Sequence, residues 1–208
     1  MRILALDGAL ARCSVALWQD GAVLGEAVVD GPRGHAAILP ALVRDLLAAS
    51  PGPCDAVAVT VGPGGFTGLR AAVSLARGLA AGWGVPCLGI TVGEALAEAL
   101  PAELRARRAL WTAVDTKRGR VALERPGEAP AVFTEDALPA APGPVAVAGD
   151  AALPVAARLL ARGTNALLTD ARLPRARDVA AVAARVLRDG TPQRPAEPLY
   201  LEPPAVRP

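Results

Sequence analysis

RILALDGALARCSVALWQDGAVLGEAVV occupies residues 2–29 and contains three short apolar runs, at 2–7, 12–19 and 22–29. Runs of this length and composition predict β-strands. The second and third runs are joined by Asp20-Gly21, a dipeptide that supplies the positive φ angles of a two-residue hairpin turn. We therefore expect the chain to begin with an antiparallel three-stranded sheet.

Helices and strands alternate after this sheet. Apolar residues recur at helical spacing from about His35 to Ala49, and a second helix is predicted from about Thr67 to Gly82. Short apolar runs at 55–61 and 86–90 predict strands, and a short helix follows at 91–100. Three antiparallel strands followed by this alternation are typical of a ribonuclease-H-like lobe in which parallel strands extend the sheet.

The opening pattern partly returns in the second half of the chain. ALDGALARCSVAL (5–17) is echoed by AVDTKRGRVAL (113–123), and the polar segment PAELRARR (101–108) lies between the two halves. We therefore predict an α/β protein of two ribonuclease-H-like lobes. The first covers 1–105; the second, smaller and reduced, covers 106–208 and includes a final helix at 176–189 and a Pro-rich tail able to pack back on the first lobe.

Composition excludes several classes of protein. Hydrophobic residues make up 52% of the chain but aromatic residues only 3%, so the core is built from Ala, Val and Leu. The net charge of +2 comes with scattered arginines, without the concentrated basic stripe of an autonomous nucleic-acid-binding protein. Three widely spaced cysteines indicate buried, reduced thiols. No run is long and apolar enough for a membrane span, and we expect a cytoplasmic protein.

The glycine-rich segment GPGGFTGLR, residues 62–70, precedes the second predicted helix. It lacks the Gly-Lys-Ser/Thr ending of a Walker loop, and Thr67 stands where the dinucleotide fingerprint requires its third glycine. Anion binding at the helix N-terminus remains an alternative. The favoured interpretation is structural, because glycines allow a strand to turn sharply into a helix.

Small residues recur every fourth position along that helix, at Gly68, Ala72, Ala76 and Ala80. Such a stripe allows close approach of another helix. We expect it to be an open groove for a helix of a partner; the alternative is that it packs only within its own lobe.

Asp7 and Asp115 end corresponding strands of the two lobes, where an actin-like ATPase directs carboxylates toward Mg²⁺-nucleotide. Their neighbours do not support nucleotide binding, since Gly8 offers no hydroxyl and Gly149-Asp150 is half of an adenosine-binding turn. Asp115, Lys117 and Arg118 suggest a solvated turn. The chain is thus predicted to keep a vestigial cleft and no metal site, with Asp7, Gly8, Asp115, Gly149 and Asp150 as its remnants.

His35 is the only histidine in the chain. A His-x-x-x-His metal pair is therefore excluded, and a Ser-His-Asp or Cys-His site would have to use His35 itself. At the start of a predicted helix, this residue is interpreted as a capping or packing residue.

Together these segments resemble the TsaB (YeaZ) family. The resemblance is carried by MRILALDGALARCSVALW, GHAAILPALVRDLL, GPGGFTGLR, VDTKRGRV and PLYLE. It implies an actin-like/Hsp70 (ASKHA) fold and a non-catalytic partner of TsaD, the metal-binding paralogue that transfers a threonylcarbamoyl group to the adenosine next to the anticodon of tRNA. It also implies assembly with the ATPase TsaE, a homodimer, tRNA contact only through the complex, and no cofactor beyond weak nucleotide binding at the junction of the complex.

The resemblance further implies that helices at about 34–49 and 67–82 form the interface with TsaD. Departures from the family pattern occur at Gly8, Ala122 and Glu202. An independent ATPase of the actin fold, or a peptidase, is the alternative function. The predicted interface residues are His35, Ile38, Leu39, Leu42, Leu46, Leu69, Arg70, Val73, Ala76, Arg77 and Ala80.

Overall fold

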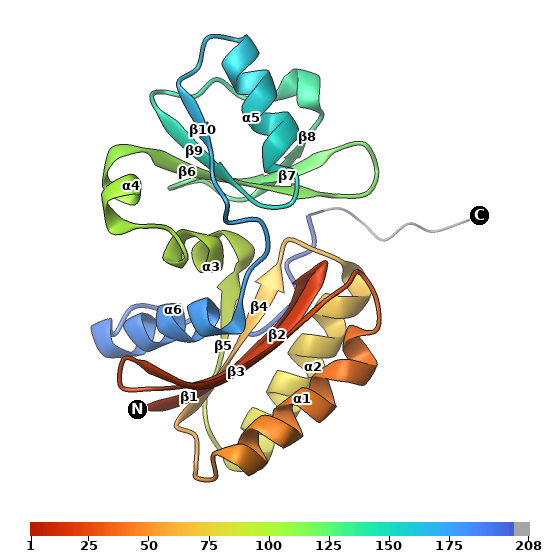
Figure 1. The fold of residues 1–208 in the computed structure, drawn as a ribbon, viewed down its shortest axis with the longest axis vertical. Coiled ribbons are helices and arrows are strands. Elements are labelled where there is room, and N and C mark those ends of the chain that lie inside the picture. Colours follow the sequence, from red (N-terminus) through yellow and green to blue (C-terminus); the bar gives the residue numbers. More distant parts are fainter. Residues whose placement is uncertain (202–208) are drawn as a thin grey trace, which may run out of the picture.

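Figure 1 shows the fold in a computed structural model that describes residues 1–201. The first sheet has the strand order β3-β2-β1-β4-β5. β1 (Arg2–Leu10), β2 (Arg12–Gln19) and β3 (Ala22–Asp30) are antiparallel, while β4 (Ala56–Gly62) and β5 (Cys87–Thr91) run parallel to β1. The predicted sheet is confirmed, and so is its turn: Asp20 and Gly21 have φ angles of 48° and 95°.

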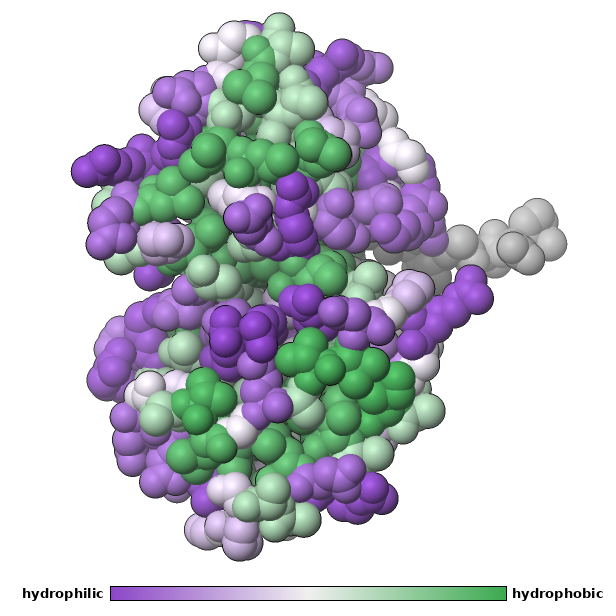
Figure 2. Space-filling view, in the orientation of Figure 1, coloured by the Kyte–Doolittle hydropathy of each residue, from purple (hydrophilic) through white to green (hydrophobic). Residues whose placement is uncertain are grey.

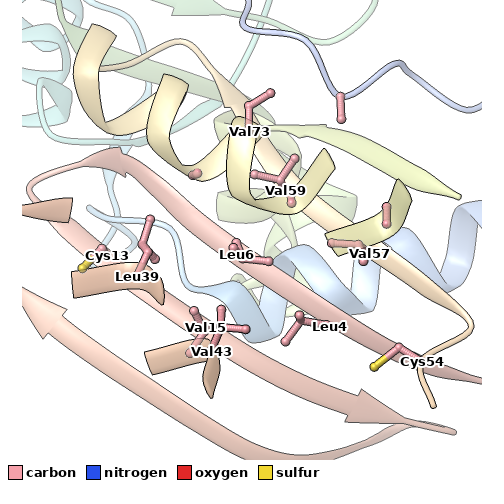
Figure 3. Close-up of a cluster of buried hydrophobic side chains, with 14 of the residues drawn as sticks. Leu4, Leu6, Cys13, Val15, Leu39, Val43, Cys54, Val57, Val59 and Val73 are labelled. Atoms are coloured by element: carbon pink, nitrogen blue, oxygen red, sulfur yellow. The ribbon is translucent and has the colours of Figure 1, made fainter. Parts of the chain in front are cut away.

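Helices cover both faces of this sheet. α1 (His35–Ala49) and α2 (Phe66–Trp83) pack on one face, against a cluster that includes Leu4, Leu6 and Val59 (Figure 3). α3 (Val92–Glu98) and α6 (Ala176–Asp189) pack on the other face, against neighbouring residues of the same strands. The alternation follows from the two-residue period of a strand, and it buries β1 and β4 on both sides.

The second sheet repeats the topology of the first, with the order β8-β7-β6-β9-β10. β6 (Ala109–Asp115), β7 (Val121–Glu124) and β8 (Ala131–Phe133) are antiparallel, and β9 (Val145–Ala148) and β10 (Ala166–Leu168) are parallel to β6. α5 (Ala152–Ala161) covers this sheet. Where α1 follows β3 in the first lobe, only the 3₁₀ turn η1 (Glu135–Ala137) follows β8. The second lobe is therefore a reduced copy of the first.

The two lobes meet at α3. Val92 and Leu96 of this helix pack against Val114, Ala122 and Ala148 of the second sheet. α4 (Ala102–Arg107) then links α3 to β6, within the polar segment 101–108. Across the junction, the carboxylate of Glu124 accepts hydrogen bonds from the Thr91 hydroxyl and from the Gly93 backbone nitrogen. An acid of the second lobe thus caps a helix of the first.

The end of the described chain lies on the first lobe. Pro195 pairs with Leu88 at the edge of β5, and the Leu199 backbone nitrogen donates to the carbonyl of Val61 at 2.7 Å. Tyr200 accepts a hydrogen bond from Nε of Arg70 at 2.7 Å. Glu202, one of the departures from the family pattern, lies outside the described residues. Within residues 1–201, no helix combines the length and hydropathy required to cross a membrane.

Candidate functional site

The glycine-rich loop packs directly on the turn that joins β1 and β2. The Gly65 backbone nitrogen donates to the carbonyl of Ala9 at 2.7 Å. A Cβ atom on Gly64 would lie 2.3 Å from the same oxygen, and one on Gly68 would lie 2.2 Å from the carbonyl oxygen of Gly8. The glycines therefore let the start of α2 lie against this turn. Because carbonyl oxygens face the loop there, the arrangement favours the structural interpretation over a phosphate site.

Asp7 is sealed inside the first lobe. Its side chain is fully buried, and Oδ1 accepts hydrogen bonds from the Thr60 hydroxyl at 2.6 Å and from the Ala9 backbone nitrogen at 3.1 Å. Oδ2 is buried without a partner among the described residues. Burial raises the pKa of Asp7 to about 6, against the opposing effects of Thr60, Ala9 and two nearby basic side chains. The carboxylate does not face an open cleft.

In the second lobe, the carboxylates of Asp115 and Asp150 both lie next to Lys117. The ammonium group of Lys117 lies 2.8 Å from Oδ2 of Asp115 and 3.4 Å from Oδ2 of Asp150. Asp150 also accepts a hydrogen bond from the Asp115 backbone nitrogen at 2.8 Å. The Lys117 ammonium lowers the pKa of Asp115. Lys117 and Arg118 are exposed, as expected for a solvated turn, and within it Lys117 pairs with both carboxylates.

Gly149 completes this group of cleft residues. It has a φ angle of 100°, and a Cβ atom there would lie 2.1 Å from the carbonyl oxygen of Ala113. The structure thus places Asp115, Gly149 and Asp150 together, while Asp7 and Gly8 are enclosed in the other lobe. Among residues 1–201, no group of three or more His, Cys, Asp and Glu side chains could hold a metal ion.

His35 holds the start of α1 against the same β1–β2 turn. The residue is 6% exposed. Nδ1 lies 3.2 Å from the carbonyl oxygen of Gly8, and Nε2 lies 2.9 Å from that of Gly31. Both ring nitrogens are therefore engaged by backbone groups, which agrees with the packing interpretation.

The residues predicted to form a partner interface separate into two groups. Ile38, Leu42 and Leu46 are half-buried, and Arg70 and Arg77 are exposed. The remaining six are buried in the first lobe: His35, Leu39, Leu69, Val73, Ala76 and Ala80. These six can support an interface but cannot contact a partner without rearrangement.

The expectation of an open groove along Ala72, Ala76 and Ala80 is wrong. These alanines are between 0% and 3% exposed and pack in the cluster formed by β1, β4 and α1. Their small side chains let α2 lie close to its own sheet. The alternative, packing within the lobe, is the correct one.

The opposite face of α2 is open and is also made of small residues. Thr67, Ser74, Gly78 and Ala81 are exposed along it, and a Cβ atom on Gly78 would meet nothing within 4 Å. α1 likewise exposes Ala37, Pro40, Arg44 and Ala48. Figure 2 shows apolar residues gathered over the region where Figure 1 places these two helices. We call these outward residues of α1 and α2 the α1–α2 face. Sequence reasoning missed it because small residues occur all around α2.

Two lobes with the same sheet topology define the two-lobed actin-like/Hsp70 (ASKHA) fold. Asp115 ends β6 as predicted, but Asp7 lies inside β1, which continues to Leu10. The family model described as TsaD, tRNA N6-adenosine threonylcarbamoyltransferase, matches residues 30–136, just over half of the chain. The chain therefore belongs to this family.

Individual proteins similar to this chain include members of the TsaB and TsaD types. The tRNA threonylcarbamoyladenosine biosynthesis protein TsaB of Escherichia coli (strain K12) is 38% identical over 124 residues, which are 58% of this chain and 53% of that protein. A tRNA N6-adenosine threonylcarbamoyltransferase of Ruegeria sp. (strain TM1040) is 42% identical over 69 residues, 31% of this chain and 19% of that protein. The chain thus matches about half or less of the length of these relatives. YeaZ from Pseudomonas aeruginosa has 28% identity and a TM-score of 0.79, with 96% of this chain and 99% of that chain covered.

Proposed function

We propose that this chain is a non-catalytic partner of a TsaD-type transferase in the formation of threonylcarbamoyladenosine in tRNA. The observation that carries the proposal is that none of the three carboxylates predicted for the cleft is free to bind a metal ion. Asp7 is enclosed in the first lobe, and Asp115 and Asp150 are both paired with Lys117. In an actin-fold ATPase, such carboxylates would have to be free to bind the metal that accompanies a nucleotide. The similarity to TsaB supports threonylcarbamoyladenosine biosynthesis as the pathway.

The α1–α2 face is the proposed docking surface for the transferase. Small side chains along α2 let the backbone of a partner helix come close, which favours helix-on-helix packing. A stable interface buries about 1,600 Å² in total, and two helices from each partner are of suitable size to supply this area. The same face would serve in a homodimer, so self-association and docking on TsaD would compete. We include in the same proposal that this chain assembles with TsaE and that it contacts tRNA only as part of the complex.

Gly78→Arg tests the docking surface without disturbing the core. The position is open to solvent, and arginine has a higher helix propensity than glycine by about 0.8 kcal/mol, so the variant should be at least as stable as the original chain. Gly143→Arg is a matched control, because Gly143 also has open space around it but lies in a loop of the second lobe.

The measurement is co-purification with a tagged TsaD-type transferase. Gly78→Arg should lose the partner, and Gly143→Arg should retain it. Equal retention by the two variants, with both folded by circular dichroism, would remove the α1–α2 face from the proposal.

A further inference from the structure

The segment PAELRARR, between the two sheets, ends in a concentration of positive charge. Arg105 and Arg107 are exposed at the end of α4, and the half-buried Arg108 follows them directly. Together with Ala109, Leu110, Pro126 and Pro144, they line a hollow of about 530 Å³ at the edge of the second lobe. Its lining contains three arginines and no carboxylate.

The charges of these arginines are poorly compensated. Arg107 has no hydrogen bond or ion pair with any residue in the described part of the chain. Arg108 donates only to uncharged oxygens, those of Val145 and Asn165. Arg105 lies 3.7 Å from Glu98, but that carboxylate is already paired with Arg185 at 2.6 Å. Among residues 1–201, the positive charge of this lining is therefore only partly balanced by carboxylates.

We propose that the hollow formed by Arg105, Arg107 and Arg108 binds backbone phosphates of RNA. Guanidinium groups match phosphate oxygens in charge and in hydrogen-bond geometry. Apart from the arginines, the lining consists of Ala, Leu and Pro side chains, with no hydroxyl, amide or aromatic ring to recognise a base or a sugar. Such a site recognises charge and not sequence, which is the role of backbone contacts in nucleic-acid binding. The inference rests on the proposed function for its RNA, since tRNA is the substrate in that pathway.

The contact would be an auxiliary one. Three arginines provide few phosphate contacts, compared with the six to ten that give strong salt dependence in DNA-binding proteins. The hollow therefore adds affinity and orientation to RNA that is held mainly elsewhere in a complex. This is consistent with the scattered arginines and the small net charge of the chain.

The test is fluorescence anisotropy of a labelled anticodon-type RNA hairpin titrated with the full chain, alone and together with a TsaD-type transferase, at about 50 and 200 mM salt. Arg105→Gln/Arg107→Gln removes two charges without touching the hydrogen bonds of Arg108. The salt slope is the decrease of log K with log salt concentration, and each lost phosphate contact lowers it by about 0.7–0.9. Raising the salt weakens RNA binding by the original chain, and for the double variant this weakening should be smaller by a factor of about ten. Arg33→Gln is the control, because Arg33 is also exposed and has no ion pair among the described residues.

Two outcomes would overturn the inference. One is an equal effect of Arg33→Gln, which would show general charge attraction. The other is calorimetric binding of pyrophosphate, lost in the double variant, without any binding of the hairpin, which would assign the hollow to a small free phosphate compound. Neither outcome bears on docking through the α1–α2 face, which is measured separately by co-purification.

Discussion

Replacing the buried Asp7 by asparagine should stabilise the protein at neutral pH. An aspartate normally titrates near 3.8, and burial raises the pKa of Asp7 to about 6 in the folded chain. Between these values the folded state binds more protons than the unfolded state, so the free energy of unfolding falls as the pH rises. At about 1.4 kcal/mol per pH unit, the loss reaches about 3 kcal/mol and persists above pH 6.

Asparagine has the shape of the aspartate side chain but carries no charge. Its oxygen can still accept the hydrogen bonds of Thr60 and Ala9, while its amide nitrogen replaces an oxygen that has no partner. Because this amide group has no hydrogen-bond partner, part of the free-energy cost of burying a polar group remains. We therefore expect Asp7→Asn to raise the free energy of unfolding by about 1–3 kcal/mol at pH 7.5, and to leave it nearly unchanged near pH 4.

Urea denaturation at the two pH values measures this difference. The exposed acid Asp45 of α1 provides a control, and Asp45→Asn should change the unfolding free energy by less than about 0.5 kcal/mol. A clear loss of stability in Asp7→Asn at pH 7.5 would refute the reasoning. It would mean that the carboxylate is stabilised in the folded protein by more than its burial and hydrogen bonds account for.

Three further substitutions test the packing. Ala76→Arg places a guanidinium group in the core between α2 and the sheet, and should cost several kcal/mol and give insoluble protein on expression. Gly64→Ala brings a Cβ atom to 2.3 Å from the carbonyl oxygen of Ala9 and should lower the melting temperature; an unchanged value would contradict the close packing of the loop. Glu124→Ala leaves the Gly93 nitrogen without its acceptor and should cost about 1–3 kcal/mol, with Glu124→Gln losing less, as measured by thermal unfolding.

Local sequence signals predicted most of the first lobe. The hairpin at Asp20-Gly21 and the helix beginning at His35 were located correctly, because turn chemistry and helical periodicity act over a few residues. The return of the opening pattern at 113–123 also indicated the second sheet, and its topology confirms the duplication. Within 101–108 no helix bounds were predicted, because the six residues of α4 are too few for periodicity to show.

The orientation of α2 could not be predicted in the same way. Ala76 and Ala81 are chemically identical, yet the first is buried in the core and the second is exposed. When small residues occupy both faces of a helix, periodicity does not distinguish the inside from the outside. The position of Lys117 between Asp115 and Asp150 also depends on tertiary structure, because Asp150 is distant in sequence.

The most direct test of the non-catalytic role is reconstitution of threonylcarbamoyl transfer to tRNA with a TsaD-type transferase, TsaE and this chain. In a triple variant, Asp7, Asp115 and Asp150 are each replaced by asparagine, which removes the charges of the cleft and leaves the α1–α2 face unaltered. The account predicts that omitting the chain abolishes transfer and that the triple variant restores it to the level of the original chain. Loss of transfer with a folded triple variant that still binds the transferase would contradict it.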